Sequence, residues 1–332
     1  MTIKAFQYGV GPIGASIVTS ANRRGAEFVG ALDVDPAKTG RDLGEIAGLD
    51  RDLGVAVEER YRDEFDDPPN ITYHATGSSL RAVSDQLKEV MNAGSNVITT
   101  AEEAIYPWRT NERLASELDA VARENGVTCL GTGINPGFVM DTLPLVLSAP
   151  LESVDEVEML RVQDAARRRK PLQEKVGAGL DEAQFAEQIV RNGGHVGSTE
   201  SIALVASALG WEIDDIEETT EPVVADRYVC SEYVEAREGD VAGVRQVAKG
   251  IRDGSAVISI DLRMYLEAER PRDEISIDGD PPISVEVVGG YHGDTSTAAI
   301  IANTTERVVQ ADPGLQSMVD IALPSHTTKF EG

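Results

Sequence analysis

The sequence predicts an α/β protein with a Rossmann-type, doubly wound parallel sheet and a second α+β domain whose open sheet is largely antiparallel. Three observations support this. Strand-like apolar runs alternate with helical segments through about residue 140, which is typical of right-handed βαβ crossovers. A glycine-rich turn follows the first of these runs. Beyond about residue 150, apolar and polar residues alternate as in half-exposed strands.

In the N-terminal part, apolar runs predict strands and apolar residues at helical spacing predict helices. We expect strands over residues 3–8, 27–33, 70–74, 96–99 and 127–131, with a short strand over 55–57 inside the polar, irregular stretch 51–69. We expect helices over residues 12–24, 79–93 and 110–125. Asn125-Gly126 is the stop signal of the last helix.

In the second half, we expect strands over residues 153–163, 243–252, 255–267, 274–277 and 283–288, and helices over 182–191, 198–209 and 296–310. Asp253-Gly254 predicts a tight hairpin between the two longest strands, because Gly accepts the positive φ that such turns need. The predicted domains are therefore residues 1–140, residues 141–295, and a C-terminal segment, 296–332, that returns to the first domain.

Composition and charge limit the function. The chain has 332 residues, of which 41% are hydrophobic, so it can bury a core. Its 57 acidic and 30 basic residues give a net charge of −27, which excludes nucleic acid as a partner. Such a carboxylate-rich surface is typical of a halophilic, salt-adapted protein, although an acidic mesophilic enzyme is the alternative.

Location follows from what the sequence lacks. It has no apolar run long enough to cross a membrane, and its N-terminus does not resemble a secretory leader. Cys129 and Cys230 form neither a disulfide framework nor a metal motif. We therefore expect a cytoplasmic protein without membrane partners and without a metal.

The first motif is Gly9-Val10-Gly11-Pro12-Ile13-Gly14, between the first strand and the first helix. Its glycines allow backbone to approach a pyrophosphate at the helix N-terminus. Asp33 ends the second strand, where a carboxylate accepts hydrogen bonds from ribose hydroxyls and repels a 2′-phosphate. We therefore expect NAD, with NADP as an alternative because Lys38, Arg23 and Arg24 lie nearby. The competing interpretation is a glycine-rich helix start that binds no nucleotide.

The second motif is residues 99–107, which follow a strand of the predicted parallel sheet. Ligands bind outside the carboxyl ends of such strands, so this turn should face the cofactor. Glu102 and Glu103 are candidates for a general base. Alternatively, they cap the following helix or lie in solvent.

The third motif, residues 131–138, holds three glycines and Pro136 and also follows a sheet strand. Such a rigid loop lets backbone approach a nicotinamide ring, although a simple domain-crossing turn is the alternative. The fourth motif, residues 193–201, precedes a helix and contains His195, which is either structural or catalytic.

Together these motifs resemble those of the 2,4-diaminopentanoate dehydrogenases and related NAD(P)-dependent amine dehydrogenases, as do residues 293–300 and 312–315 with Asp320. The resemblance covers essentially the whole chain. It implies an architecture shared with dihydrodipicolinate reductase, usually as a homodimer. It also implies oxidative deamination of an amine or diamino acid and, in reverse, reductive amination of a ketone with ammonia.

The resemblance assigns residues to roles. It places the catalytic carboxylate at Glu102 or Glu103 and lines the substrate pocket with Pro107, Phe138 and His195. The expected cofactor-binding residues are Gly9, Gly11, Pro12, Ile13, Gly14, Asp33, Thr76, Thr100, Asn135, Pro136 and Gly137.

Two other functions remain open. A dihydrodipicolinate reductase-like imine or enamine reductase would need a histidine-rich catalytic segment, whereas residues 161–175 hold no histidine. A non-catalytic NAD-binding protein would bind the cofactor without turnover. A diamino acid substrate would need a cation for its carboxylate, for which Arg161, Arg168 and Lys175 are candidates.

Overall fold

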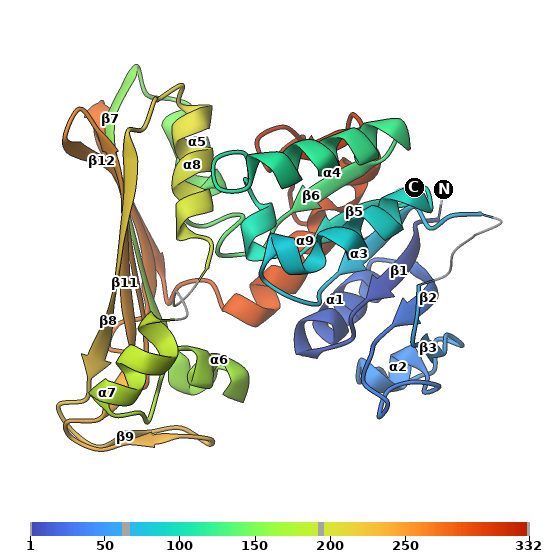
Figure 1. Cartoon of the computed structure of the whole chain (residues 1–332), viewed down its shortest axis with the longest axis horizontal. Helices are drawn as coiled ribbons and strands as arrows, with labels where there is room; N and C mark the ends of the chain where they lie inside the picture. Colours follow the sequence, from blue (N-terminus) through green and yellow to red (C-terminus); the bar gives the residue numbers. More distant parts are fainter. Residues whose placement is uncertain (1, 62–66, 192–195, 331–332) are drawn as a thin grey trace. The chain divides into compact units, whose positions relative to one another are not determined.

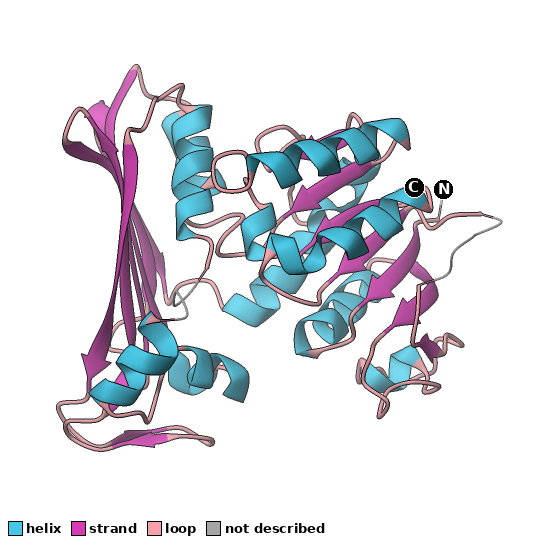
Figure 2. Ribbon diagram, viewed as in Figure 1, coloured by secondary structure: helices cyan, strands magenta, loops and turns pink. Residues whose placement is uncertain are grey.

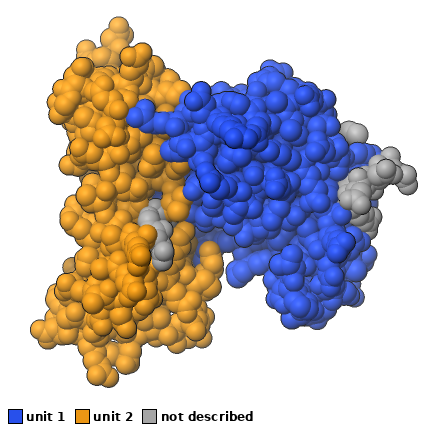
Figure 3. Space-filling model, viewed as in Figure 1, with its two compact units in different colours: residues 1–138, 293–332 blue, residues 139–292 orange. Residues whose placement is uncertain are grey.

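The computed structural model describes residues 2–61, 67–191 and 196–330. The chain folds into two units (Figure 3). Unit 1 comprises Met1–Phe138 and Gly293–Gly332, and unit 2 comprises Val139–His292. The C-terminal segment therefore folds with the N-terminal unit.

Unit 1 is built on a seven-stranded sheet in the order β15-β6-β5-β4-β1-β2-β3, in which each neighbouring pair runs parallel. Its strands are β1 (Lys4–Tyr8), β2 (Glu27–Leu32), β3 (Val57–Glu58), β4 (Ile71–His74), β5 (Asn96–Thr99), β6 (Thr128–Gly131) and β15 (Gly314–Gln316). The strand order reverses between β1 and β4, where doubly wound sheets bind ligands at their carboxyl ends. The predicted Rossmann-type sheet is confirmed.

Helices cover both faces of this sheet (Figures 1 and 2). They are α1 (Pro12–Arg23), α2 (Leu43–Ile46), α3 (Leu80–Asn92), α4 (Glu112–Glu124) and α9 (Gly293–Val309), with one 3-10 turn, η1 (Glu102–Ala104). α1 and α9 contribute to one buried apolar cluster with the strands, and α3 and α4 contribute to another. The apolar spacing predicted for α3 is what places Leu80, Val83 and Leu87 in that second cluster.

Unit 2 is built on a six-stranded sheet in the order β14-β13-β7-β12-β11-β8. Its strands are β7 (Ser153–Asp164), β8 (Asp215–Val224), β11 (Val241–Arg252), β12 (Ser255–Tyr265), β13 (Arg272–Asp280) and β14 (Ile283–Val288). β7 and β12 run parallel and the other neighbours antiparallel, so the sheet is mixed but mostly antiparallel, as predicted. A separate two-stranded ribbon pairs β9 (Val229–Cys230) with β10 (Glu235–Ala236).

Helical segments lie on one face of this sheet (Figure 2). They are α5 (Thr142–Ser148), η2 (Ala165–Arg167), α6 (Lys170–Lys175), α7 (Glu182–Phe185), η3 (Ala186–Val190) and α8 (Ser198–Ala208). Phe185 of α7 is buried with Leu262 and Met264 of β12, which gives this unit its own core. The described residues include no helix long and apolar enough to cross a membrane.

The Asp253-Gly254 hairpin forms as predicted. Arg252 pairs with Ser255 across the turn, and both turn residues have positive φ, 52° for Asp253 and 77° for Gly254. These values belong to the left-handed region that Asp tolerates and Gly adopts without strain.

Candidate active site

Two glycines of the first motif are required by the packing of unit 1 itself. Gly9 has a φ of +88°, and a Cβ there would lie 2.6 Å from the carbonyl oxygen of Ala75. A Cβ at Gly14 would lie 2.0 Å from the carbonyl oxygen of Gly9. The loop therefore packs tightly against both the start of α1 and the segment after β4.

Gly11 differs from these two glycines. No atom lies within 4 Å of where its Cβ would be, so protein packing does not require glycine at this position. Gly11 is the N-cap of α1 and supplies no side-chain hydrogen bond to it. An open glycine at the positive end of a helix is what a pyrophosphate requires, so these residues fit a dinucleotide.

Asp33, at the end of β2, anchors this loop. Its Oδ2 accepts hydrogen bonds from the backbone N–H of Val10 at 2.8 Å and from Lys38 Nζ at 2.9 Å, and its Oδ1 accepts one from the N–H of Asp35 at 2.9 Å. Burial raises the pKa of Asp33, but the Lys38 and backbone hydrogen bonds outweigh it and hold that pKa below its usual value. The carboxylate is therefore ionised and in place beside the loop.

A buried polar network supports the turn after β4, where Thr76 lies. His74 is fully buried, and its Nδ1 lies 2.9 Å from Thr99 Oγ1. Its Nε2 lies 2.8 Å from Gln86 Oε1 and 3.0 Å from Thr76 Oγ1. Burial lowers the pKa of His74 to about 4, so its imidazole is neutral. Sequence reasoning missed this residue, because a single histidine on a strand carries no motif.

The two acids of the second motif have different surroundings. Glu103 Oε2 accepts a 2.7 Å hydrogen bond from the backbone N–H of Leu80 and a 3.2 Å bond from Ser79 Oγ. Glu103 therefore caps α3, the helix that precedes it, rather than the helix that follows. Its charge also suits the positive end of that helix. Glu102 is half-buried in the same turn of η1, after β5.

The third motif packs directly against η1. A Cβ at Gly131 would lie 2.4 Å from the carbonyl carbon and oxygen of Ala104, so only glycine fits there. The N–H of Thr132 donates to the carbonyl of Thr99 at 3.0 Å. The N–H of Ile134 donates to Thr297 Oγ1 of α9 at 3.3 Å. The structure thus brings together motifs that lie far apart in the sequence, and adds Thr297, which the predicted site residues did not include.

The other residues predicted to bind the cofactor or the substrate lie in the turns after β4, β5 and β6, apart from His195. Thr100 donates its N–H to the carbonyl of His74 at 3.0 Å, and Pro107 is buried. Asn135 and Pro136 lie in the loop after β6, and Phe138 packs against the core that contains α1 and α9. His195 lies outside the described residues.

Arg161, one of the cations predicted to bind the carboxylate of a substrate, is already paired with a residue of the protein. Arg161 is buried, and its Nη1 forms an ion pair with Asp273 at 2.5 Å. Its Nη2 donates to the carbonyl of Tyr291 at 2.8 Å. Removing Arg161 would leave a buried carboxylate, so this residue is part of the framework of unit 2.

A doubly wound parallel sheet with an open glycine turn at its reversal point, followed by a mixed second sheet, is typical of dinucleotide-binding oxidoreductases. Residues 138–330 match the family model described as the 2,4-diaminopentanoate dehydrogenase C-terminal domain. The chain is 34% identical over 323 residues to the 2,4-diaminopentanoate dehydrogenase of Acetoanaerobium sticklandii, covering 90% of this chain and 92% of that protein. The chain therefore belongs to the 2,4-diaminopentanoate dehydrogenase family.

Solved structures of other oxidoreductases have a similar fold. An amine dehydrogenase from Mycobacterium smegmatis matches with a TM-score of 0.86 and 26% identity, covering 99% of both chains. An oxidoreductase from Agrobacterium radiobacter, solved with NAD+, L-tartaric acid and magnesium, matches with a TM-score of 0.60 and 13% identity, covering 96% of this chain and 92% of that one. The second likeness shows the fold alone.

Proposed function

We propose that this protein catalyses the reversible oxidative deamination of a carbon that bears an amino group, with a diamino acid resembling 2,4-diaminopentanoate as its substrate. The observation that carries the proposal is the family match along nearly the whole chain, joined to a carboxylate-bearing turn at the carboxyl end of β5. In the forward direction the substrate carbon loses a hydride and takes its oxygen from water. The hydride passes to the oxidised nicotinamide cofactor, so the products are a ketone, ammonium, the reduced cofactor and one proton. The reverse reaction is the reductive amination of that ketone.

The cofactor in this proposal is NAD, held by Gly9–Gly14 and by Asp33. Open space at Gly11 supports a pyrophosphate there, and an ionised Asp33 favours ribose hydroxyls over a 2′-phosphate. Lys38, in contact with Asp33, offsets part of that repulsion, so NADP is the second candidate. The Agrobacterium oxidoreductase of this fold holds NAD+. When bound, the nicotinamide ring supplies the hydride acceptor.

Glu102 is the proposed catalytic carboxylate. Because Glu103 is held by the N-terminus of α3, Glu102 is the member of the pair that we assign to the substrate. A carboxylate beside the reacting carbon stabilises the positive charge that develops on nitrogen and moves protons between that nitrogen and water. The loop Asn135–Gly137 would position the nicotinamide, and Pro107, Phe138 and His195 would border the substrate.

The test is the formation of NADH or NADPH at alkaline pH and high KCl, with 2,4-diaminopentanoate, simple aliphatic amines and common amino acids as substrates. Turnover of the diamino acid supports the full proposal. Turnover of simple amines alone keeps the reaction and replaces the substrate class. Binding of NAD by calorimetry with no turnover of any of these would favour a cyclic-imine reductase or a non-catalytic NAD-binding protein.

We further propose that the enzyme works as a homodimer in the cytoplasm of a salt-adapted cell. The family resemblance supports the dimer, and the net charge of −27 supports salt adaptation. Light scattering of the purified protein in KCl tests the dimer, since a mass of one chain would contradict it.

A further inference from the structure

A cavity of about 560 Å³ lies in unit 1 against α1, α9 and the C-terminal tail, and it contains none of the residues proposed above to hold the cofactor or the substrate. Thirteen described residues line it: Ala15, Ser16, Thr19, Ser20, Arg23, Arg24, Ala47, Thr295, Ala298, Ala299, His326, Thr327 and Thr328. Two of them are arginines, one is a histidine, several carry hydroxyls, and none is an Asp or Glu. In a chain with nearly twice as many acids as bases, a cavity lined only by cationic and neutral groups is unexpected.

Arg24 is the buried cation of this cavity, with 8% of its surface exposed. Its Nη1 donates to both the carbonyl and Oγ of Ser20, each at 2.9 Å, and its Nε donates to Asn303 Oδ1 at 3.1 Å. All these acceptors are neutral. Within the described parts of the chain, no carboxylate forms an ion pair with Arg24 or Arg23. Burial lowers the pKa of Arg24, which reflects the cost of holding this charge away from water.

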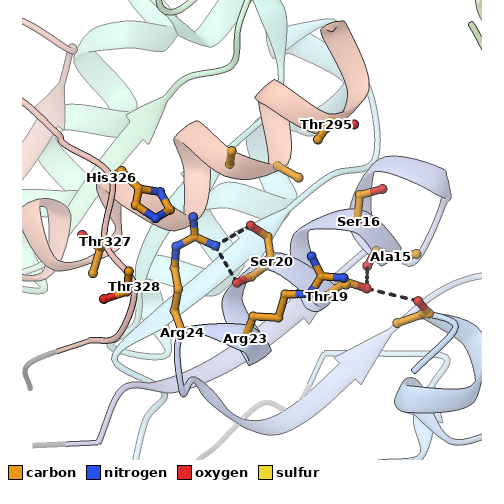
Figure 4. Close-up of a pocket in the computed structure, with 13 residues that line it drawn as sticks. Ala15, Ser16, Thr19, Ser20, Arg23, Arg24, Thr295, His326, Thr327 and Thr328 are labelled. Atoms are coloured by element: carbon orange, nitrogen blue, oxygen red, sulfur yellow. Dashed lines mark hydrogen bonds between the residues drawn. The ribbon is translucent and has the colours of Figure 1, made fainter. Parts of the chain in front are cut away.

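The C-terminal tail closes one side of the cavity. Phe330 donates its N–H to the carbonyl of Arg24 at 2.9 Å, and Thr327 donates its N–H to Asn303 Oδ1 at 3.1 Å. Figure 4 shows the Arg24 guanidinium with Ser20 on one side and His326 on the other. Arg23 is the last residue of α1, and its side chain is exposed at the rim of the cavity. One buried and one exposed guanidinium thus line the same space.

We propose that this cavity binds a small metabolite anion carrying at least two oxyanion groups, a phosphate ester or a polycarboxylate. Arg24 supplies the buried charge and Arg23 a second charge at the rim. Planar guanidinium groups bind both phosphate and carboxylate oxygens with paired hydrogen bonds, and Ser20 offers its hydroxyl beside them. The volume is suited to a small organic molecule rather than a single inorganic ion.

The test is calorimetry with citrate and pyrophosphate as probes, at constant ionic strength maintained with KCl. We expect one of them to bind, and the tighter of the two identifies carboxylate or phosphate as the preferred group. Arg24→Gln should weaken binding about tenfold or more, and Arg23→Gln should weaken it to a smaller extent. Arg113→Gln, which removes an exposed arginine of α4, is the matched control and should leave binding unchanged.

Two further variants distinguish anion binding in this cavity from anion binding at the proposed cofactor site, and test the role of the Arg24 charge. Gly11→Val blocks the glycine loop, so pyrophosphate binding that survives it is not binding at the cofactor site. Ser20→Asp places a carboxylate beside Arg24 and should abolish anion binding while raising the melting temperature without ligand. If Arg24→Gln fails to fold, binding of the probes to Ser20→Asp and Arg23→Gln still tests the proposal. The proposal is overturned if neither probe binds, if the affinity is unchanged in Arg23→Gln, if binding persists in Ser20→Asp, or if it is lost in Gly11→Val.

Discussion

Glu102 and Glu103 are neighbours in the chain, but their surroundings assign them different tasks. The side chain of Glu103 reaches back to the first turn of α3, a segment more than twenty residues earlier, and caps it at Leu80 N and Ser79 Oγ. Sequence alone identified the pair and could not separate its members, because which of them caps a helix depends on how that helix packs. The structure thereby directs a mutational test at each residue.

The substitution Glu102→Gln should affect activity, whereas Glu103→Gln should affect stability. Glu102→Gln should abolish deamination while cofactor affinity and the free energy of unfolding stay near those of the wild type. Glu103→Gln should retain turnover but lower the free energy of unfolding by about 1 kcal/mol, because α3 loses a charged cap. Steady-state rates and denaturant titrations measure both. Full activity in Glu102→Gln would remove this residue from the mechanism.

His74 makes stability depend on pH. Its pKa is about 4 in the folded protein and 6.5 in an unfolded chain, so the unfolded state binds a proton first as the pH falls. The stabilisation is complete above pH 6.5 and is lost progressively between 6.5 and about 4. When the pH falls from about 7 to about 5, the protonation of His74 in the unfolded chain should lower the free energy of unfolding by about 2 kcal/mol.

The variant His74→Gln tests this prediction. Denaturant titrations at the two pH values should show a drop in the wild type that is about 2 kcal/mol larger than the drop in the variant. Comparing the two proteins removes the contribution of the many carboxylates, which both share. An equal pH dependence would show that His74 does not titrate in this way.

At the scale of an element, the glycine loop before α1 combines two kinds of glycine. Gly14 is required by the fold, because a Cβ there would overlap the carbonyl of Gly9, whereas Gly11 faces open space. Sequence reasoning treated both as parts of one fingerprint. Only the packing around each position separates a glycine that the chain needs from one that a ligand needs.

Changing these two glycines should therefore give different results. Gly11→Ala should lower the melting temperature only slightly, because alanine is a poorer N-cap than glycine, and should weaken NAD binding, since its methyl group occupies the space proposed for the pyrophosphate. Gly14→Ala should lower the melting temperature strongly or prevent folding. Differential scanning calorimetry and NAD titration measure the two effects. Unchanged NAD affinity in Gly11→Ala would place the cofactor elsewhere.

Elements with strong periodicity were predicted well, and those without it were missed. The predicted helix over residues 79–93 is α3, and the predicted strand over 96–99 is β5. The prediction omitted β8 and the short β15. β8 is an edge strand with largely exposed, acidic residues, so no alternation of buried and exposed positions marks it. β15 has three residues and exists because it pairs with β6.

At the scale of the whole molecule, the net charge of −27 should govern stability. Carboxylates spread along the chain repel one another, and salt shortens the range of that repulsion from about 10 Å at 0.1 M to about 3 Å at 1 M. Such repulsion acts on the folded, compact state more than on the expanded chain.

We expect the melting temperature to rise as KCl increases from about 0.1 M to about 2 M. A variant with Glu212→Gln and Glu217→Gln, two exposed acids of unit 2, should be less sensitive to salt. Differential scanning fluorimetry across the KCl series measures both proteins. A flat or falling curve for the wild type would contradict salt adaptation.

The sequence by itself determined the fold class, most of the elements and the family, because apolar periodicity, turn residues and glycine motifs act over a few neighbouring residues. The tertiary structure alone decided which glutamate caps α3, which glycine faces open space, that Arg161 is held by Asp273, and that Arg24 is buried among neutral partners. Each of these depends on segments that are distant in sequence and meet only when the chain folds. Local patterns carry no information about such encounters.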